Sequence, residues 1–139
     1  MASGDNEVIA MLPQPYVTTV VTQNTNTNVR IALDVTEEWE KLAGKDSTVV
    51  TGVVAVNAEF AKNNPQAVAK FMEEYRKSTD YVNSNIDGAA QIMEDEGIFK
   101  AAIAKKAIPY CNITFITGKE MKTKITGYLS VLNSQNPAS

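Results

Sequence analysis

The stretch Val8–Val21, VIAMLPQPYVTTVV, is the segment around which we expect the rest of the chain to fold. It opens with an unbroken apolar run typical of a strand covered on both faces, and Pro13 ends that strand because proline has no N–H to donate. Pro15 suits the first turn of a following helix, where a missing N–H costs nothing. The stretch therefore predicts a buried strand, a stiff proline elbow carrying Gln14 and Tyr16, and a short helix. In an open α/β sheet, ligands bind just past the carboxyl end of such a strand.

The composition is that of a globular domain, because 44% of the 139 residues are hydrophobic and 21% are charged. The net charge of −3 provides no basic surface for nucleic acid or for an anionic membrane. The chain contains no histidine, which removes the commonest general base and the commonest metal ligand. Its single cysteine, Cys111, allows no disulfide within the chain and is expected to be a small core residue. We therefore predict no metal and no cofactor.

Two later stretches also have the composition of strands, Val29–Val35 and Thr48–Val56. Gly52 interrupts the second, and a glycine inside a strand marks a bulge or a close approach by another backbone or a ligand. A further extended segment is expected over 110–116. The chain begins with a short polar segment that leads directly into a strand needing neighbours on both sides. We therefore expect the chain to be a fragment of a longer protein.

The remaining segments predict helices. Asn64-Pro65 is a start signal for a long helix reaching about residue 83, with an apolar stripe on one face. Thr36 is expected to cap a short helix that contains Trp39, the only tryptophan, which we interpret as a packing anchor. Thr117 and Glu120 have the spacing of a capping box that opens the last helix. Shorter helices are expected over 57–63, 87–96 and 98–107.

No pattern of residues indicates catalysis. The chain has no phosphate-binding glycine loop, no nucleophile elbow and no cluster with metal-ligand spacing. The charged residues 73, 74, 76 and 77 fall largely off the apolar stripe of their helix, and we interpret them as a solvated face. An enzyme would need a proton-transferring or polarising group that the sequence does not display.

The order of these segments resembles the C-terminal half of a bacterial ABC-transporter substrate-binding protein. The similar group includes binders of sulfonates, taurine, nitrate and thiamine-pyrimidine precursors. In that family a strand leads into a Pro-Glu/Gln-Pro-Tyr/Phe elbow, matched here by Pro13-Gln14-Pro15-Tyr16. A later segment of the family begins with Asp or Asn, continues with Phe and ends in Asn-Pro, and residues 57–65 match it. A Tyr-Val-Asn-x-Asn segment is matched by residues 81–85. The resemblance covers about residues 4–135.

The resemblance implies a fold and a partial domain organisation. The expected class is an α/β fold of the periplasmic-binding-protein type II kind, present in part. Residues 1–47 would end the second lobe with the proline elbow, and residues 48–139 would supply a hinge strand and the C-terminal helices of the first lobe. The N-terminal half and a signal peptide would be missing, so apolar surface would be exposed and copies could associate through it.

The resemblance also implies a function, namely the solute-binding component of an ABC importer, located in the periplasm or on the outer face of the membrane as a lipoprotein. Its partners would be a small solute and the permease subunits, and it would not be an enzyme. The expected ligand contacts are Leu12, Pro13, Gln14 and Tyr16 at the elbow and Thr51 and Gly52 on the crossing strand. Two alternatives stay open: an enzyme of pyrimidine or thiamine-precursor synthesis with the same fold, and a self-associating interaction module.

Overall fold

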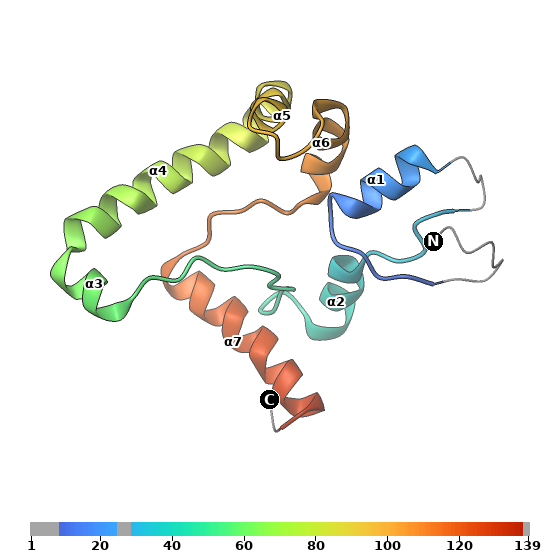
Figure 1. Ribbon diagram of the computed structural model, residues 1–139. Coiled ribbons are helices and arrows are strands. Elements are labelled where there is room, and N and C mark those ends of the chain that lie inside the picture. The colour runs from blue at the N-terminus through green and yellow to red at the C-terminus, as the bar shows by residue number, and fades with distance from the viewer. Residues whose placement is uncertain (1–8, 25–28, 138–139) are drawn as a thin grey trace. The chain divides into compact units, whose positions relative to one another are not determined.

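The computed structural model describes residues 9–24 and 29–137, and every regular element in these ranges is helical (Figure 1). No helix there combines the length and the apolar character needed to cross a membrane. The elements, in order, are α1 (Tyr16–Gln23), α2 (Val35–Ala43), α3 (Ala58–Asn63), α4 (Pro65–Ser84), α5 (Ile86–Asp95), α6 (Ala101–Ala107), the short 3-10 helix η1 (Ile108–Tyr110) and α7 (Gly118–Gln135).

The expected α/β fold of the periplasmic-binding-protein type II kind is wrong for the described residues, which contain no strand and no sheet. The segments with strand composition lie at 9–13, 29–34, 47–57 and 112–117, and they have no regular secondary structure. Their composition favours strands, but a strand forms only when a neighbouring strand accepts and donates its backbone hydrogen bonds. Within the described ranges, residues 48–56 make no backbone hydrogen bond to another segment.

The chain divides into two compact units, each built from two separate stretches of sequence. The first contains residues up to Arg30 together with Asp80–Ile113, and the second contains Ile31–Thr79 and the residues from Thr114 onward. The helix α4 therefore belongs to the second unit up to Thr79 and to the first unit beyond it. The division into lobes at residues 47 and 48 concerned a longer protein and stays a prediction.

The first unit has a small core between α5 and α6, which lie side by side in Figure 1. Its buried members are mostly alanines, which let the two helices approach closely, and Ile108 is the largest of them at 3% exposure. The buried cluster consists of Ala89, Ala90, Ala104 and Ile108, and half-buried residues such as Phe99 and Met93 pack against it. The helix predicted over 98–107 is shorter than expected, because α6 begins at Ala101.

Glu94, near the end of α5, contacts the two residues at the start of α6 and so holds the connection between the helices. Its carboxylate accepts a hydrogen bond from the backbone N–H of Ala101 at 2.8 Å and contacts the Lys100 ammonium at 3.2 Å. Lys100 precedes α6 but gives it no side-chain cap, so the distant carboxylate satisfies a first-turn donor instead. The hydrogen bond from Ala101, and then that from Lys100, lower the pKa of Glu94 below its ordinary value.

We expect the stability of the α5–α6 pair to fall in acid because of Glu94. A carboxyl whose pKa is lowered in the folded state stabilises that state above its unfolded pKa of about 4.3, and this contribution disappears as pH falls through the folded pKa. Glu94→Gln keeps an acceptor oxygen but loses the charge. Its urea midpoint, followed by circular dichroism from pH 7 to pH 3.5, should be lower at neutral pH and should change less with acid. Glu96→Gln is the control, because Glu96 makes no side-chain contact among the described residues; an equal change in both variants would contradict the prediction.

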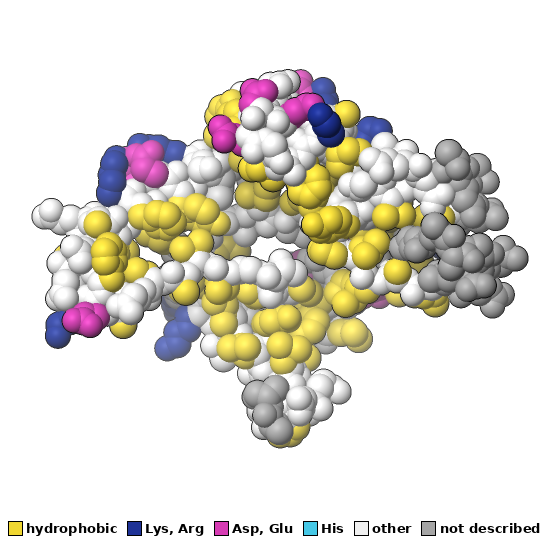
Figure 2. Space-filling model, in the orientation of Figure 1, with side chains coloured by type: hydrophobic (Ala, Val, Ile, Leu, Met, Phe, Trp, Pro, Cys, Tyr) yellow, Lys and Arg dark blue, Asp and Glu magenta, His cyan; other side chains and the backbone are white. Residues whose placement is uncertain are grey.

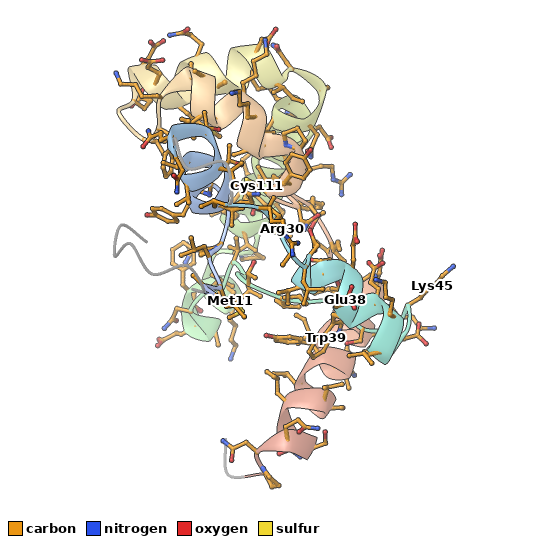
Figure 3. All side chains as sticks on the ribbon, turned by 90° about the vertical axis from the view of Figure 1, so that its right-hand side faces the viewer. Met11, Arg30, Glu38, Trp39, Lys45 and Cys111 are labelled. Carbon is orange, nitrogen blue, oxygen red and sulfur yellow. The ribbon has the colours of Figure 1, made fainter. Side chains whose placement is uncertain are left out.

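In the second unit, Trp39 joins α2 to α7. Its side chain extends from α2 toward α7 in Figure 3, with its ring centroid 5.1 Å from that of Tyr128. The indole N–H donates to the Ser47 hydroxyl at 2.9 Å, and Ser47 is buried at 4% exposure. Gly127 allows α7 to lie close to the loop that carries Ser47, because a Cβ at that position would lie only 2.6 Å from the backbone oxygen of Asp46. The interpretation of Trp39 as a packing anchor therefore agrees with its contacts.

Helix starts follow the sequence closely, although not always through the expected residue. The long helix begins at Pro65 as predicted, and the Asn57 side chain caps α3 by accepting from the Phe60 N–H at 3.0 Å. The cap of α2 is Asp34 rather than Thr36, since the Asp34 carboxylate accepts from the backbone of the first turn. Thr117 occupies the N-cap position of α7 but makes no side-chain capping bond, so the capping box is not formed.

Many apolar side chains are left on the surface, as the yellow atoms of Figure 2 show for one face. Large exposed fractions are found in the segments without regular structure, and also at Leu42 in α2, which is 89% exposed. Ile9 is 99% exposed, Leu33 is 70% exposed and Val53 is 67% exposed. The expectation of a buried strand before the elbow is therefore wrong for residues 9–12, and Val8 lies outside the described residues. The physical cause is that the described part of the chain supplies no facing layer for these side chains to pack against.

Candidate functional site

The proline elbow lies directly before α1 and is tied to it by backbone hydrogen bonds. The peptide bond between Gln14 and Pro15 is cis, and Pro15 occupies the N-cap position of α1. The Pro15 carbonyl accepts from the N–H of Thr19 at 2.9 Å and from its hydroxyl at 3.1 Å. The expected junction of a proline turn and a short helix is therefore present, and the turn is held by the first turn of the helix.

Gln14 is half-buried and caps α1 with its side chain. The N–H of Thr18 donates to the Gln14 Oε1 atom at 3.3 Å, and the Thr18 hydroxyl donates to the same atom at 2.8 Å. A helix leaves its first N–H groups without intrahelical partners, so this carbonyl satisfies one of them. The part of Gln14 that can contact a ligand is consequently its Nε2 amide group.

Tyr16 is the first residue of α1, and its side chain is 55% exposed. Its ring meets that of Phe99 at a centroid distance of 6.0 Å and an interplanar angle of 79°, an edge-to-face arrangement. Phe99 lies in the connection between α5 and α6, and α1 also contacts α6. Tyr16 is therefore partly held by the small core of the first unit while much of its ring stays accessible.

The structure brings four of the six predicted contact residues together in one turn. Leu12 and Pro13 are exposed immediately before Gln14, with Leu12 at 36% exposure. Thr51 and Gly52 belong to the second unit and are exposed in a segment without regular structure. A Cβ built on Gly52 would meet nothing within 4 Å, so no described neighbour requires a glycine there. Ligand binding by these six residues stays a prediction.

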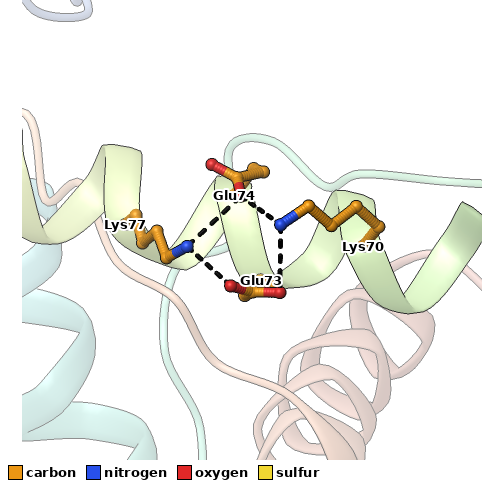
Figure 4. A network of polar contacts seen from close by, with 4 residues as sticks. All are labelled: Lys70, Glu73, Glu74 and Lys77. Atoms are coloured by element: carbon orange, nitrogen blue, oxygen red, sulfur yellow. Dashed lines mark hydrogen bonds and ion pairs between the residues drawn. The ribbon is translucent and has the colours of Figure 1, made fainter.

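The paired glutamates of α4 do not form an acid–base site. Figure 4 shows Glu73 and Glu74 each contacting both Lys70 and Lys77, at distances from 2.6 to 3.3 Å. Hydrogen bonds from the lysines lower the pKa of both carboxyls, whereas a general acid at neutral pH needs a raised one. This agrees with the interpretation of these residues as a solvated face. Arg76, which was also assigned to the solvated face, contacts an aromatic ring instead: its guanidinium lies 4.9 Å from the centre of the Phe115 ring.

Cys111 is not poised as a nucleophile. Its thiol donates to the Ala107 carbonyl at 3.2 Å, and burial raises its pKa above the ordinary value. A raised pKa reduces the thiolate fraction at neutral pH, and the thiolate is the reactive form. Among the described residues there is also no group of three or more acidic, cysteine or histidine side chains that could hold a metal ion.

Two features of the elbow were not foreseen from the sequence, namely the contacts of Thr18 and Phe99. The spacing of Gln14 and Thr18 could have indicated a capping bond, since they are four residues apart at a helix start. Phe99 is 83 residues beyond Tyr16, and no local pattern connects them. The structure also contains an open surface hollow of about 400 Å³ with a lining of mixed charge: Lys45, Asp46, Lys119, Glu120, Thr123 and Lys124.

No family model, curated protein or solved structure matches the chain at a significant level.

Proposed function

We propose that this chain belongs to the solute-binding component of an ABC importer and that it contacts the solute through its proline elbow. Two things support the proposal: the order of segments shared with that family, and the geometry of the elbow. A turn fixed by its own helix presents the Gln14 amide and the exposed Tyr16 ring from neighbouring positions. Small-molecule sites combine aromatic side chains with a few polar groups that fix the orientation of the ligand, and Tyr16 and Gln14 are residues of these two kinds.

In this proposal the component binds its solute without chemical conversion outside the cytoplasm and delivers it to the permease subunits. The exposed apolar segments around Ile9, Leu33 and Val53 then contact the rest of the same component. Contiguous exposed apolar side chains mark interaction surfaces in soluble proteins. The observation that carries the solute-binding proposal is nevertheless the elbow, because Gln14 and Tyr16 bring a donor group and an accessible ring into one turn, two positions apart in the chain.

We expect the full chain to be stabilised by at least one of three probe solutes: taurine, nitrate and 4-aminopyrimidine. A ligand that binds only the folded state stabilises it by about 2.7 kcal/mol when its concentration is 100 times its Kd. A thermal-shift measurement should therefore show a raised melting temperature with one probe. Tyr16→Ala should abolish the shift and Tyr110→Ala should keep it, because Tyr110 is an exposed tyrosine outside the elbow. Absence of a shift with all three probes, or equal behaviour of the two variants, would overturn the proposal.

A second candidate function, self-association, is favoured by the exposed segments alone. Val53, Val54 and Val56 are each more than half exposed on a stretch whose backbone makes no hydrogen bond to another described segment. Such a stretch can pair with another polypeptide. Analytical ultracentrifugation over a range of concentrations tests this. A dimer that Val53→Asp dissociates would support self-association, and a monomer throughout would exclude it.

A further inference from the structure

The side chain of Gln14 has a defined orientation, and this determines what the elbow can recognise. A backbone N–H can only donate, so the Gln14 atom that faces the N–H of Thr18 must be the carbonyl oxygen. The Thr18 hydroxyl donates to the same oxygen at 2.8 Å. Two donors from one residue therefore occupy the acceptor end of Gln14, and its amide N–H groups are left for other partners.

We propose that the elbow selects a neutral, planar solute that carries a hydrogen-bond acceptor, through the Nε2 amide of Gln14 and the ring of Tyr16. This inference rests on the proposed solute-binding function and specifies its ligand class. The amide supplies donors, and the exposed part of the Tyr16 ring supplies a flat apolar surface. A solute with an acceptor gains a hydrogen bond here that a solute without one cannot make.

A small anion fits the same site less well. The face of an aromatic ring carries partial negative charge, so the Tyr16 ring disfavours an anion placed over it. Residues 9–24 contain no lysine or arginine that could compensate an anionic charge. Lys100, which follows Phe99 in the chain, contacts the carboxylate of Glu94 at 3.2 Å. The N-terminus of α1 attracts negative charge, but the N–H groups of Val17 and Thr18 already donate to Pro13 and Gln14 and are not offered to an anion. The elbow therefore favours a neutral heteroaromatic solute over a sulfonate or nitrate.

Binding of two matched probes to the full chain tests this ligand class by titration calorimetry. The probes are 4-aminopyrimidine and aniline, which share a six-membered ring and an amino group but differ in the two ring nitrogens that accept hydrogen bonds. The wild-type chain should bind 4-aminopyrimidine about fivefold more tightly than aniline or taurine, the difference expected from one hydrogen bond of average strength. Equal binding of the two rings, or tighter binding of taurine, would overturn the proposal.

Gln14→Glu tests the role of the amide, because it keeps the shape and an oxygen for Thr18 but removes the two N–H donors. It should lose about tenfold in affinity for 4-aminopyrimidine, and unchanged affinity would overturn the proposal while leaving solute binding intact. If the wild-type chain binds none of the probes, both the ligand class and the proposed function fail. The two failures are therefore distinguishable.

Hydrogen exchange measured without any ligand tests the orientation itself. The Thr18 amide should be protected in the wild-type chain and in Gln14→Glu, since both keep an acceptor oxygen. In Gln14→Leu, which has a similar size and no acceptor, exchange at Thr18 should become at least tenfold faster while the Thr19 amide stays protected through Pro15. Unchanged exchange at Thr18 in Gln14→Leu would show that the side chain is not held as described.

Discussion

Ile108→Ala is expected to unfold the α5–α6 core, with a loss of about 2–5 kcal/mol in the free energy of unfolding. Ile108 is 3% exposed and is the largest buried member of a cluster whose other buried members are alanines. Removing three heavy atoms from such a position loses their transfer free energy and leaves a cavity that the alanines cannot fill. Because small domains have only 5–15 kcal/mol of stability, this loss is large.

The matched control for this prediction is Ile98→Ala. Ile98 lies in the connection between α5 and α6 and is 61% exposed, so its replacement should change stability by no more than about 0.5 kcal/mol. Amide hydrogen exchange of α5 and α6, combined with urea denaturation, measures the stability of these two helices in each variant separately from that of the rest of the chain. If Ile98→Ala destabilised the helices as much as Ile108→Ala, the core would not be centred on Ile108.

Gly127→Ala is the second substitution with a large expected effect, and it should destabilise the contact between α2 and α7. A Cβ at this position would lie 2.6 Å from the Asp46 backbone oxygen and 3.0 Å from the Ser47 Cβ, so the loop backbone has to move. Overpacking costs about 1–3 kcal/mol, whereas alanine gains about 1 kcal/mol over glycine inside a helix. Because the obstructing atom belongs to the backbone, we expect a net loss of about 1–2 kcal/mol.

Trp39 provides a local measurement for this second prediction. It is the only tryptophan of the chain, and it lies against Tyr128 and Ser47 at the same contact, so its fluorescence reports on this contact alone. Gly127→Ala should shift the emission to longer wavelength and lower the urea midpoint of the fluorescence transition. Gly52→Ala is the control, because a Cβ there would meet no atom of the described residues within 4 Å beyond its chain neighbours. A stabilised Gly127→Ala chain would contradict the described approach of α7 to residues 46 and 47.

The sequence alone predicted most of the helices because a helix forms its hydrogen bonds within a few residues. Asn64-Pro65 predicted the start of α4, and the helix begins at Pro65. Asn57 predicted the cap of α3, and its side chain makes that bond. Where the prediction failed, the competing residue was equally local: Asp34 rather than Thr36 caps α2, two positions earlier in the chain.

The strands could not be predicted in the same way, because a strand depends on a partner that is often distant in the sequence. Residues 48–56 have the β-branched composition of a buried strand, yet all residues from Thr51 to Val56 are exposed and the stretch forms no ladder with another described segment. The fold class was therefore wrong although the local composition was read correctly. Composition describes what a strand needs, and tertiary structure decides whether the partner is supplied.

The candidate site shows the same division. By itself the sequence determined the proline elbow, the short helix after it and the residues that the turn carries, because proline and helix geometry act over neighbouring residues. Only the tertiary structure decided that Phe99 packs against Tyr16, since that contact joins positions 83 residues apart. The contact of Thr18 with the acceptor end of Gln14 joins residues only four positions apart, so it belongs with the features that the sequence could have indicated.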